Sequence, residues 1–288
     1  MKLKSTPSCF LNRIAPDFVR SVRVLLLVGL IAGAAAPDPA PGPVRIIGGP
    51  TTGCIAGAVE LPPEGTGYRT IHPAASAFWG APSTIATVQE LGRRARSAGI
   101  GDLYVEEISK PRGGLISGVH ASHQTGLDID IGLDTRQKPD LTPAQRETVE
   151  LPTLVRPDRR FVLEDRWSPA TATLLRLAAE LPEIDRVLVN PAIKRKLCDS
   201  TTGDRAWLRR IRPWYGHAAH MHVHLRCPAD QVDCVSQLPP PAGDGCDASL
   251  AWWFEQLDAP SPPSSEKPKP LPPISAACRV IFAGAKPF

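Results

Sequence analysis

Two short stretches of the chain alternate apolar residues with aspartate or histidine, and they constrain the fold more than any other sequence feature. In LDIDIGL (residues 127–133) leucine and isoleucine alternate with two aspartates, and in HMHVHL (residues 220–225) apolar residues alternate with three histidines. Successive side chains of a β-strand point to opposite faces of its sheet. Each stretch therefore predicts a strand with one face for the core and one lined with imidazoles or carboxylates, which indicates a site.

The remaining segments predict helices and strands in a mixed order. Two segments are expected to be strands: LYVEEIS, and RVLVNPAI, which ends at Pro191. Three segments have helical spacing and helix-terminal signals. They are STIATVQELGRRARSAG with Ser83 as N-cap, SPATATLLRLAAEL with Ser168 as N-cap and Pro169 at the first helical position, and GDRAWLRRIRP, ended by Pro213. The expected fold class is α+β, with an antiparallel sheet that bears the site and a loop-rich body.

The amino terminus is typical of an export signal. Five basic residues precede the apolar run VLLLVGLIAGAAA (residues 24–36), which ends in small residues. Thirteen residues are few for a bilayer span, which needs about 20, so residues 1–36 are expected to be a cleaved signal peptide. A retained membrane anchor is the alternative. These residues hold five of the 33 basic and one of the 29 acidic residues, so the remainder has 28 of each and offers no basic surface that would favour nucleic acid.

The rest of the chain is expected to form one domain, residues 37–257, followed by a Pro-rich tail, residues 258–288. Six cysteines remain after the signal peptide: Cys54, Cys198, Cys227, Cys234, Cys246 and Cys278. An even number in an exported chain favours disulfides. Spacing alone does not choose among the 15 pairings that six cysteines allow, but a disulfide at Cys278 would pin the tail.

A loop histidine and a strand aspartate are spaced to bind one metal ion. His123 and Asp130 lie seven residues apart across a turn that contains glycine, and one histidine of the second strand would complete a His2Asp set. Zinc favours such ligands, and a catalytic zinc keeps one position for water, whose pKa it lowers from about 15.7 toward 7. A neighbouring histidine can move the proton. Asp128 is expected to support a histidine from behind the ligands.

Five motifs together carry a resemblance to a known family. They are SGVHASHQTGLDIDIGL, VNPAIKRKLC, DRAWLRRIRPW, HAAHMHVHLRCP and GDGCDASLAWWFE, in this order between residues 110 and 255. They resemble the penicillin-insensitive murein endopeptidases, which belong to the lysostaphin and D-Ala-D-Ala metallopeptidase class. The resemblance implies a periplasmic zinc enzyme, with residues 37–257 as its metallopeptidase domain. Its expected activity is hydrolysis of the D-alanyl–meso-diaminopimelyl cross-links between stem peptides of peptidoglycan.

The resemblance also implies roles for the histidines. His123, Asp130 and His222 match the metal ligands of the class, and His220 matches the general base. One functional zinc ion per chain is expected, because no histidine lies between His123 and His217. The remaining candidates are His120 as a further metal ligand, and His217, His224 and Trp214 in substrate binding or a proton network.

Two further consequences follow from the resemblance. The implied disulfides are Cys54–Cys278, Cys198–Cys246 and Cys227–Cys234. His224 stands where similar sequences tend to have arginine, so His222 and His224 are an alternative reading of the H-x-H pair. The following LRCP favours His220 and His222.

Other functions fit the residues less well. A D-Ala-D-Ala carboxypeptidase would typically have Glu-x-x-His, but Ala219 lies three residues before His222 and no glutamate occurs between positions 184 and 254. No G-x-S-x-G elbow surrounds Ser117 or Ser122, which argues against a serine hydrolase. A catalytically silent peptidoglycan-binding or metal-binding protein is the alternative from another class. A dimer is compatible with the sequence.

Overall fold

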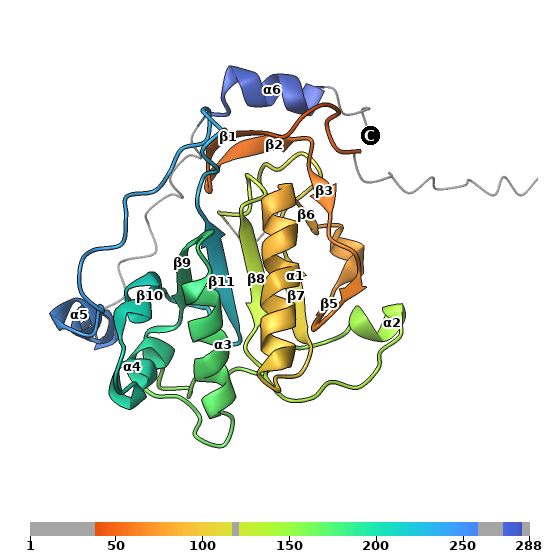
Figure 1. Cartoon of the computed structure of the whole chain (residues 1–288). Coiled ribbons are helices and arrows are strands. Elements are labelled where there is room, and N and C mark those ends of the chain that lie inside the picture. The colour runs from red at the N-terminus through yellow and green to blue at the C-terminus, as the bar shows by residue number, and fades with distance from the viewer. Residues whose placement is uncertain (1–37, 117–120, 259–272, 284–288) are drawn as a thin grey trace, which may run out of the picture. The chain divides into compact units, whose positions relative to one another are not determined.

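A seven-stranded sheet carries both alternating stretches and forms the centre of the computed structural model (Figure 1). The structure describes residues 38–116, 121–258 and 273–283. In order across the sheet, the strands are β10 (Ile211–Pro213), β9 (Ile184–Val189), β11 (His220–Leu225), β8 (Asp128–Gly132), β7 (Leu103–Glu107), β5 (Tyr68–Thr70) and β4 (Glu64–Gly65). The four predicted strands are therefore confirmed, and all four lie in the middle of one sheet.

The sheet is mixed, whereas a purely antiparallel sheet was expected. Strand β11 pairs antiparallel with both β8 and β9, but β10 is parallel to β9 and β5 is parallel to β7. Parallel neighbours need a crossover connection, which usually contains a helix. Here α1 (Pro82–Ser97) lies between β5 and β7, and α4 (Pro191–Ser200) lies between β9 and β10. Three strands of this sheet were not predicted, and β4, β5 and β10 have only two or three residues each, too few to show a period in the sequence.

The two faces of the sheet have different partners. Helices α1 and α3 (Pro169–Glu180) lie across one face in Figure 1. The core on this face includes these buried apolar residues of the central strands: Ile129, Ile131, Val187, Val189, Ile211, Met221, Val223 and Leu225. Because side chains alternate along a strand, the intervening residues of the same strands face away from α1 and α3. Asp130 on β8 and His222 on β11 are such residues, and they are cross-strand partners.

Local signals explain where most helices begin. At α3 the Ser168 hydroxyl accepts a hydrogen bond from the backbone N–H of Thr171, as an N-cap does, and Pro169 takes the first helical position, as predicted. The expectation that Ser83 caps α1 was wrong: Ala81 is the N-cap residue, no side chain caps the helix, and Pro82 starts it. The other helices are α2 (Pro143–Arg146), α5 (Ala248–Asp258), α6 (Ala276–Ala283) and the 3-10 helices η1 (Pro73–Ala75) and η2 (Ala206–Arg210).

One predicted helix is partly a strand. GDRAWLRRIRP forms η2 and then β10, which ends at Pro213. The apolar spacing of Trp207, Leu208 and Ile211 suits a helix, but the 3-10 turn already buries Trp207 and Leu208. Ile211 then pairs in parallel with Val187 of β9. Pairing with the sheet outweighed the local pattern.

Two small two-stranded sheets and three disulfides complete the fold. The small sheets pair β1 (Arg45–Gly49) with β2 (Thr52–Ala56) and β3 (Val59–Glu60) with β6 (Trp79–Gly80). The disulfides are Cys54–Cys278, Cys198–Cys246 and Cys227–Cys234. They are the three pairs that the resemblance implies. The first joins α6 to β2, so it ties the end of the described chain to its beginning.

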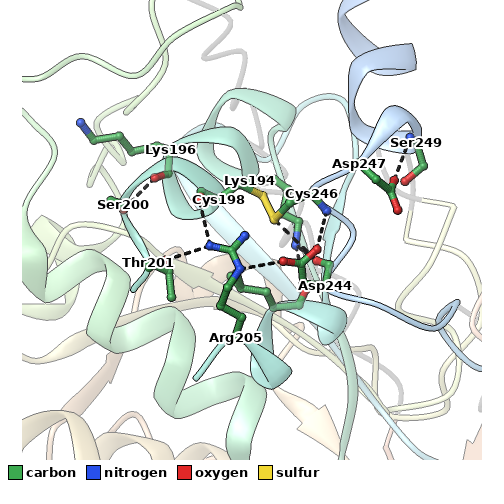
Figure 2. Close-up of a disulfide and its surroundings, with 11 residues drawn as sticks. Lys194, Lys196, Cys198, Ser200, Thr201, Arg205, Asp244, Cys246, Asp247 and Ser249 are labelled. Atoms are coloured by element: carbon green, nitrogen blue, oxygen red, sulfur yellow. Dashed lines mark hydrogen bonds and ion pairs between the residues drawn. A yellow bond between two sulfur atoms is a disulfide. The ribbon is translucent and has the colours of Figure 1, made fainter. Parts of the chain in front are cut away.

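The Cys198–Cys246 disulfide joins α4 to the loop before α5 (Figure 2). In this region Arg205 donates hydrogen bonds to the Asp244 carboxylate and to the Cys198 carbonyl. Lys194 is fully buried, and its ammonium group donates to the carbonyls of Leu208 and Asp244. Burial lowers the pKa of Lys194 to about 7. These bonds fix the loop that follows β11.

Some expectations lie outside the described residues. These are the signal peptide (residues 1–36), His120, Ser117 and most of the Pro-rich stretch of the tail (residues 259–272). In the part of the chain that the structure describes, no helix combines the length and the apolar character that a bilayer span requires.

Candidate metal centre and cleft

Three side chains from two strands and one loop form the candidate metal centre. Asp130 on β8 lies directly opposite His222 on β11, and His123 lies in the loop before β8. Each residue offers one ligand atom, and these three atoms lie within 4.8 Å of one another. All three residues are buried. The structure therefore brings together the three residues that the sequence proposed as ligands.

The loop before β8 aims the ring of His123. His123 has a left-handed backbone, with φ of 66°, and Gly126 has φ of 70°, so the chain turns sharply between these two residues. The His123 Nδ1 lies 2.8 Å from the carbonyl oxygen of Ile108. A carbonyl only accepts hydrogen bonds, so Nδ1 carries the hydrogen. The other nitrogen, Nε2, lies 3.3 Å from Oδ2 of Asp130 and is the ligand atom available to a cation.

The carboxylate of Asp128 contacts two of the candidate ligands and His224. This carboxylate accepts the backbone N–H of His123 at 3.1 Å and lies 3.1 Å from Nε2 of His222. It also lies 2.7 Å from Nδ1 of His224. With Nε2 bonded to Asp128, His222 directs Nδ1 at Oδ1 of Asp130, 3.0 Å away. Carboxylates that orient metal-ligating histidines in this way fix the tautomer of the ring.

Two buried carboxylates set the electrostatics of the centre. Burial favours a higher pKa for Asp128 and Asp130, but the surrounding imidazoles hold both pKa values well below the ordinary range. Burial likewise favours a lower pKa for His123 and His222, but their hydrogen bonds and charge interactions with the carboxylates raise both, that of His222 to about 10. The two carboxylates thus favour positive charge at the site, which a divalent cation would supply in place of protons. Two imidazole nitrogens and one carboxylate oxygen fit zinc.

His220 lies beside this centre, with carboxylates near both of its ring nitrogens. Its Nε2 is 3.6 Å from Oδ2 of Asp130, and its Nδ1 is 3.6 Å from Oε2 of Glu106. The ring is partly exposed, so a substrate or water can reach it. The group of potential ligands found among the described residues includes His222 but neither His220 nor His224, which agrees with His220 and His222 as the H-x-H pair.

Glu106 lies beside His220, and sequence reasoning did not single it out. Glu106 sits where the pairing of β7 with β8 shifts register, since Val105 pairs with Ile131 but Glu107 pairs with Asp130. Such bulges re-aim a side chain, and here Oε1 of Glu106 lies 3.7 Å from Nδ1 of His72.

His72 is the N-cap residue of η1, and its Nε2 lies 2.7 Å from the carbonyl oxygen of Val149. Because that oxygen can only accept, His72 Nε2 is the donor. For Glu106, the available sequence signal was the pair of consecutive glutamates, Glu106 and Glu107, at the end of an apolar strand.

The centre opens onto a cleft with a volume of about 1070 Å³. Its lining includes His217, His220 and His222 together with Trp214, Tyr215 and Trp253. Trp214 is 54% exposed, so it lies at the cleft and not in the core. The hydroxyl of Tyr215 donates to the backbone carbonyl of Trp253 at 2.6 Å, which connects α5 to this wall.

The two remaining histidines take different positions. His217 lines the cleft, with its ring 5.2 Å from that of His220 and 5.8 Å from that of His222. Burial lowers the pKa of His217 to about 4, so the ring is neutral near pH 7. His224 is buried, is bonded to Asp128 and is not among the residues that line the cleft. A place in the hydrogen-bonded network fits His224, whereas direct substrate contact does not.

The fold and the site define a class, which is a disulfide-bonded α+β protein with a candidate His2Asp cation centre at a cleft. A family model described as penicillin-insensitive murein endopeptidase matches residues 46–283. The chain belongs to this family, as its motifs indicated.

Curated relatives agree with the family model. A penicillin-insensitive murein endopeptidase of Klebsiella pneumoniae (strain 342) is 42% identical over 264 residues, which cover 88% of this chain and 96% of the relative. One of Citrobacter koseri is 41% identical over 264 residues, with 89% and 94% covered. One of Salmonella heidelberg is 41% identical over 246 residues, with 85% and 88% covered. The chain is thus a member of a peptidase family along nearly its whole folded length.

Proposed function

We propose that the protein is a periplasmic, zinc-dependent endopeptidase that hydrolyses D-alanyl–meso-diaminopimelyl cross-links of peptidoglycan. The observation that carries this proposal is the group of His123, Asp130 and His222 beside a cleft that His220 also lines. Family membership and the names of the relatives support murein as the substrate. Three disulfides support an oxidising compartment outside the cytoplasm.

The orientation of each side chain supports the proposed ligand roles. His123 through Nε2, Asp130 through its carboxylate and His222 through Nδ1 would hold the ion, while Asp128 keeps the ring of His222 in the required tautomer. When bound, zinc supplies a Lewis acid that polarises the scissile carbonyl and lowers the pKa of a water molecule. The set requires neutral imidazoles, so protons must leave when the ion enters.

His220 is the proposed general base and acid. Its Nε2 faces the metal centre, so this atom takes a proton from the attacking water and later delivers it to the departing amine. Glu106, near Nδ1, orients the ring and stabilises it when it carries the proton. The separation of 3.6 Å exceeds a hydrogen bond, but catalytic hydrogen bonds are often long without substrate and tighten when it binds.

The test uses cross-linked muropeptide dimers. Purified protein should convert dimers to monomers, lose this activity in a chelator, regain it when zinc is added, and be unaffected by penicillin. Chromatography of the muropeptides measures the conversion. Dimers that stay intact with zinc present, while the protein still binds them, would instead indicate a silent wall-binding protein.

A further inference from the structure

The cleft contains a guanidinium group that the described chain does not pair. Arg212 on β10 lines the cleft and is half-buried. Within residues 38–116, 121–258 and 273–283, no side chain or carbonyl forms a hydrogen bond or ion pair with its side chain. Burial, and then the charge of Arg186, lowers the pKa of Arg212, and Asp247 opposes this more weakly. A charge partly withdrawn from water without a partner is unfavourable, so an anion at this place would be stabilised.

The sheet register fixes where Arg212 lies relative to the metal centre. Arg212 is the cross-strand partner of Leu188 on β9, and Leu188 is the partner of His222 on β11. Cross-strand partners project from the same face, so Arg212 and His222 share the face turned away from α1 and α3. Two strand spacings separate their Cα atoms by about 10 Å.

On this face, acidic and basic residues lie on opposite sides of β11. Asp128 and Asp130 on β8, with Glu106 and Glu107 on β7, lie on one side of β11. The arginines lie on the other side, on β9 and β10.

Arg186 on β9 also lines the cleft, but it donates to the Asp185 carboxylate and to the carbonyl of Leu238. Arg212 therefore has the more available guanidinium, and Arg186 adds positive potential beside it.

We propose that Arg212, supported by Arg186, binds a free carboxylate of the stem peptide and thereby selects substrates. An extended peptide advances about 3.3–3.6 Å per residue, so this carboxylate would lie about three residues from the bond at the metal centre. A planar guanidinium binds a carboxylate through two parallel hydrogen bonds, which a carboxamide does not match. This inference rests on the proposed function, because it assigns the substrate that function implies.

The experiment compares cross-linked dimers in which one free carboxylate at a time is converted to a carboxamide. For the wild type, one such conversion should raise KM roughly 10- to 100-fold, the range for a hydrogen bond to a charged group, with kcat little changed. Arg212→Met should show the same rise on the unmodified dimer and no further rise on that amide. The KM of Arg212→Lys for the unmodified dimer should lie between the KM values of the wild type and of Arg212→Met. Arg226→Met, an exposed arginine that does not line the cleft, is the matched control and should behave as the wild type.

A binding measurement separates this inference from the proposed function. Calorimetric titration of the zinc-free protein with uncross-linked stem peptide, as acid and as amide, should show the same preference in the wild type and its loss in Arg212→Met. The inference is overturned if the wild type binds every amide as tightly as the acid. It is also overturned if Arg212→Met still binds the acid more tightly than the amide. If the wild type cleaves no dimer but still prefers the acid to the amide, only the proposed hydrolytic function is contradicted. Zinc content and thermal unfolding of Arg212→Met should match the wild type.

Discussion

Alanine substitutions of two histidines on β11, His220 and His222, are expected to have different effects on zinc binding and turnover. His222 lies within the group of ligand atoms, whereas His220 lies beside it and faces the cleft. His222→Ala should lose both zinc and activity. His220→Ala should keep zinc and lose about 10²- to 10⁴-fold in kcat, the usual contribution of a general base. Metal analysis and steady-state kinetics on dimers measure both. Undiminished turnover in His220→Ala would place the base elsewhere.

Glu106 should act through His220 and not through the metal. Glu106→Gln keeps the size of the side chain but removes the charge near Nδ1 of His220. We expect a fall in kcat of about tenfold, with KM and zinc content unchanged and partial recovery in Glu106→Asp. Glu60→Gln, an exposed glutamate on β3, is the matched control. A fall in zinc content equal to that in kcat would mean that Glu106 supports the ligands instead.

Individual residues were predictable where they belong to a regular pattern. His123 and Asp130 follow from their spacing, alternation predicts histidines on one face of the second strand, and the resemblance selects His222 among them. The structure brings these three residues together. Glu106 did not follow, because its position depends on a bulge that only the pairing of β7 with β8 reveals. The contact between His72 and Val149 did not follow either, since the two residues lie 77 positions apart in the sequence.

At the scale of elements, the long-range disulfide fixes the last described helix. Cys54–Cys278 spans 224 residues and joins α6 to β2, whereas Cys227–Cys234 spans seven. By loop-closure entropy, Cys54→Ser/Cys278→Ser should lower the free energy of unfolding by about 5 kcal/mol and Cys227→Ser/Cys234→Ser by about 2.5 kcal/mol.

Equilibrium denaturation of the two variants tests this ranking. Both should keep zinc, because neither disulfide touches the ligands. Equal losses of stability, or a larger loss for Cys227→Ser/Cys234→Ser, would show that local strain or packing outweighs loop closure.

Elements were predictable where they are long or strongly patterned. β8 and β11 followed from alternation, and α3 followed from Ser168 and Pro169. β5 and β10 did not, because three residues show no period and their parallel pairing depends on distant strands. The mixed sheet was missed for the same reason. Alternation nevertheless predicts which residues of β8 and β11 share a face, because successive side chains point to opposite sides of the sheet.

At the scale of the whole molecule, metal uptake should be linked to pH. Without metal, the pKa of His222 is raised to about 10, because Asp128 and Asp130 outweigh burial. At pH 7 this ring is therefore protonated, and an entering ion must displace the proton. Zinc affinity should rise about tenfold per pH unit for each proton released, as pH increases toward 10.

Calorimetry in buffers of different ionisation enthalpy measures the released protons. About one or more per chain is expected at pH 7. An affinity that does not change between pH 6 and 8, with no proton release, would contradict the raised pKa of His222. Activity should decline at acid pH for the same reason, because the ligands and the base must be neutral.

The most direct test of the account is the zinc content of the correctly oxidised protein. Elemental analysis after zinc loading and removal of free metal should find one ion per chain in the wild type and in His220→Ala, and almost none in Asp130→Ala. Wild-type protein that is folded and disulfide-bonded, yet holds no stoichiometric zinc and gains no activity from added zinc, would contradict it.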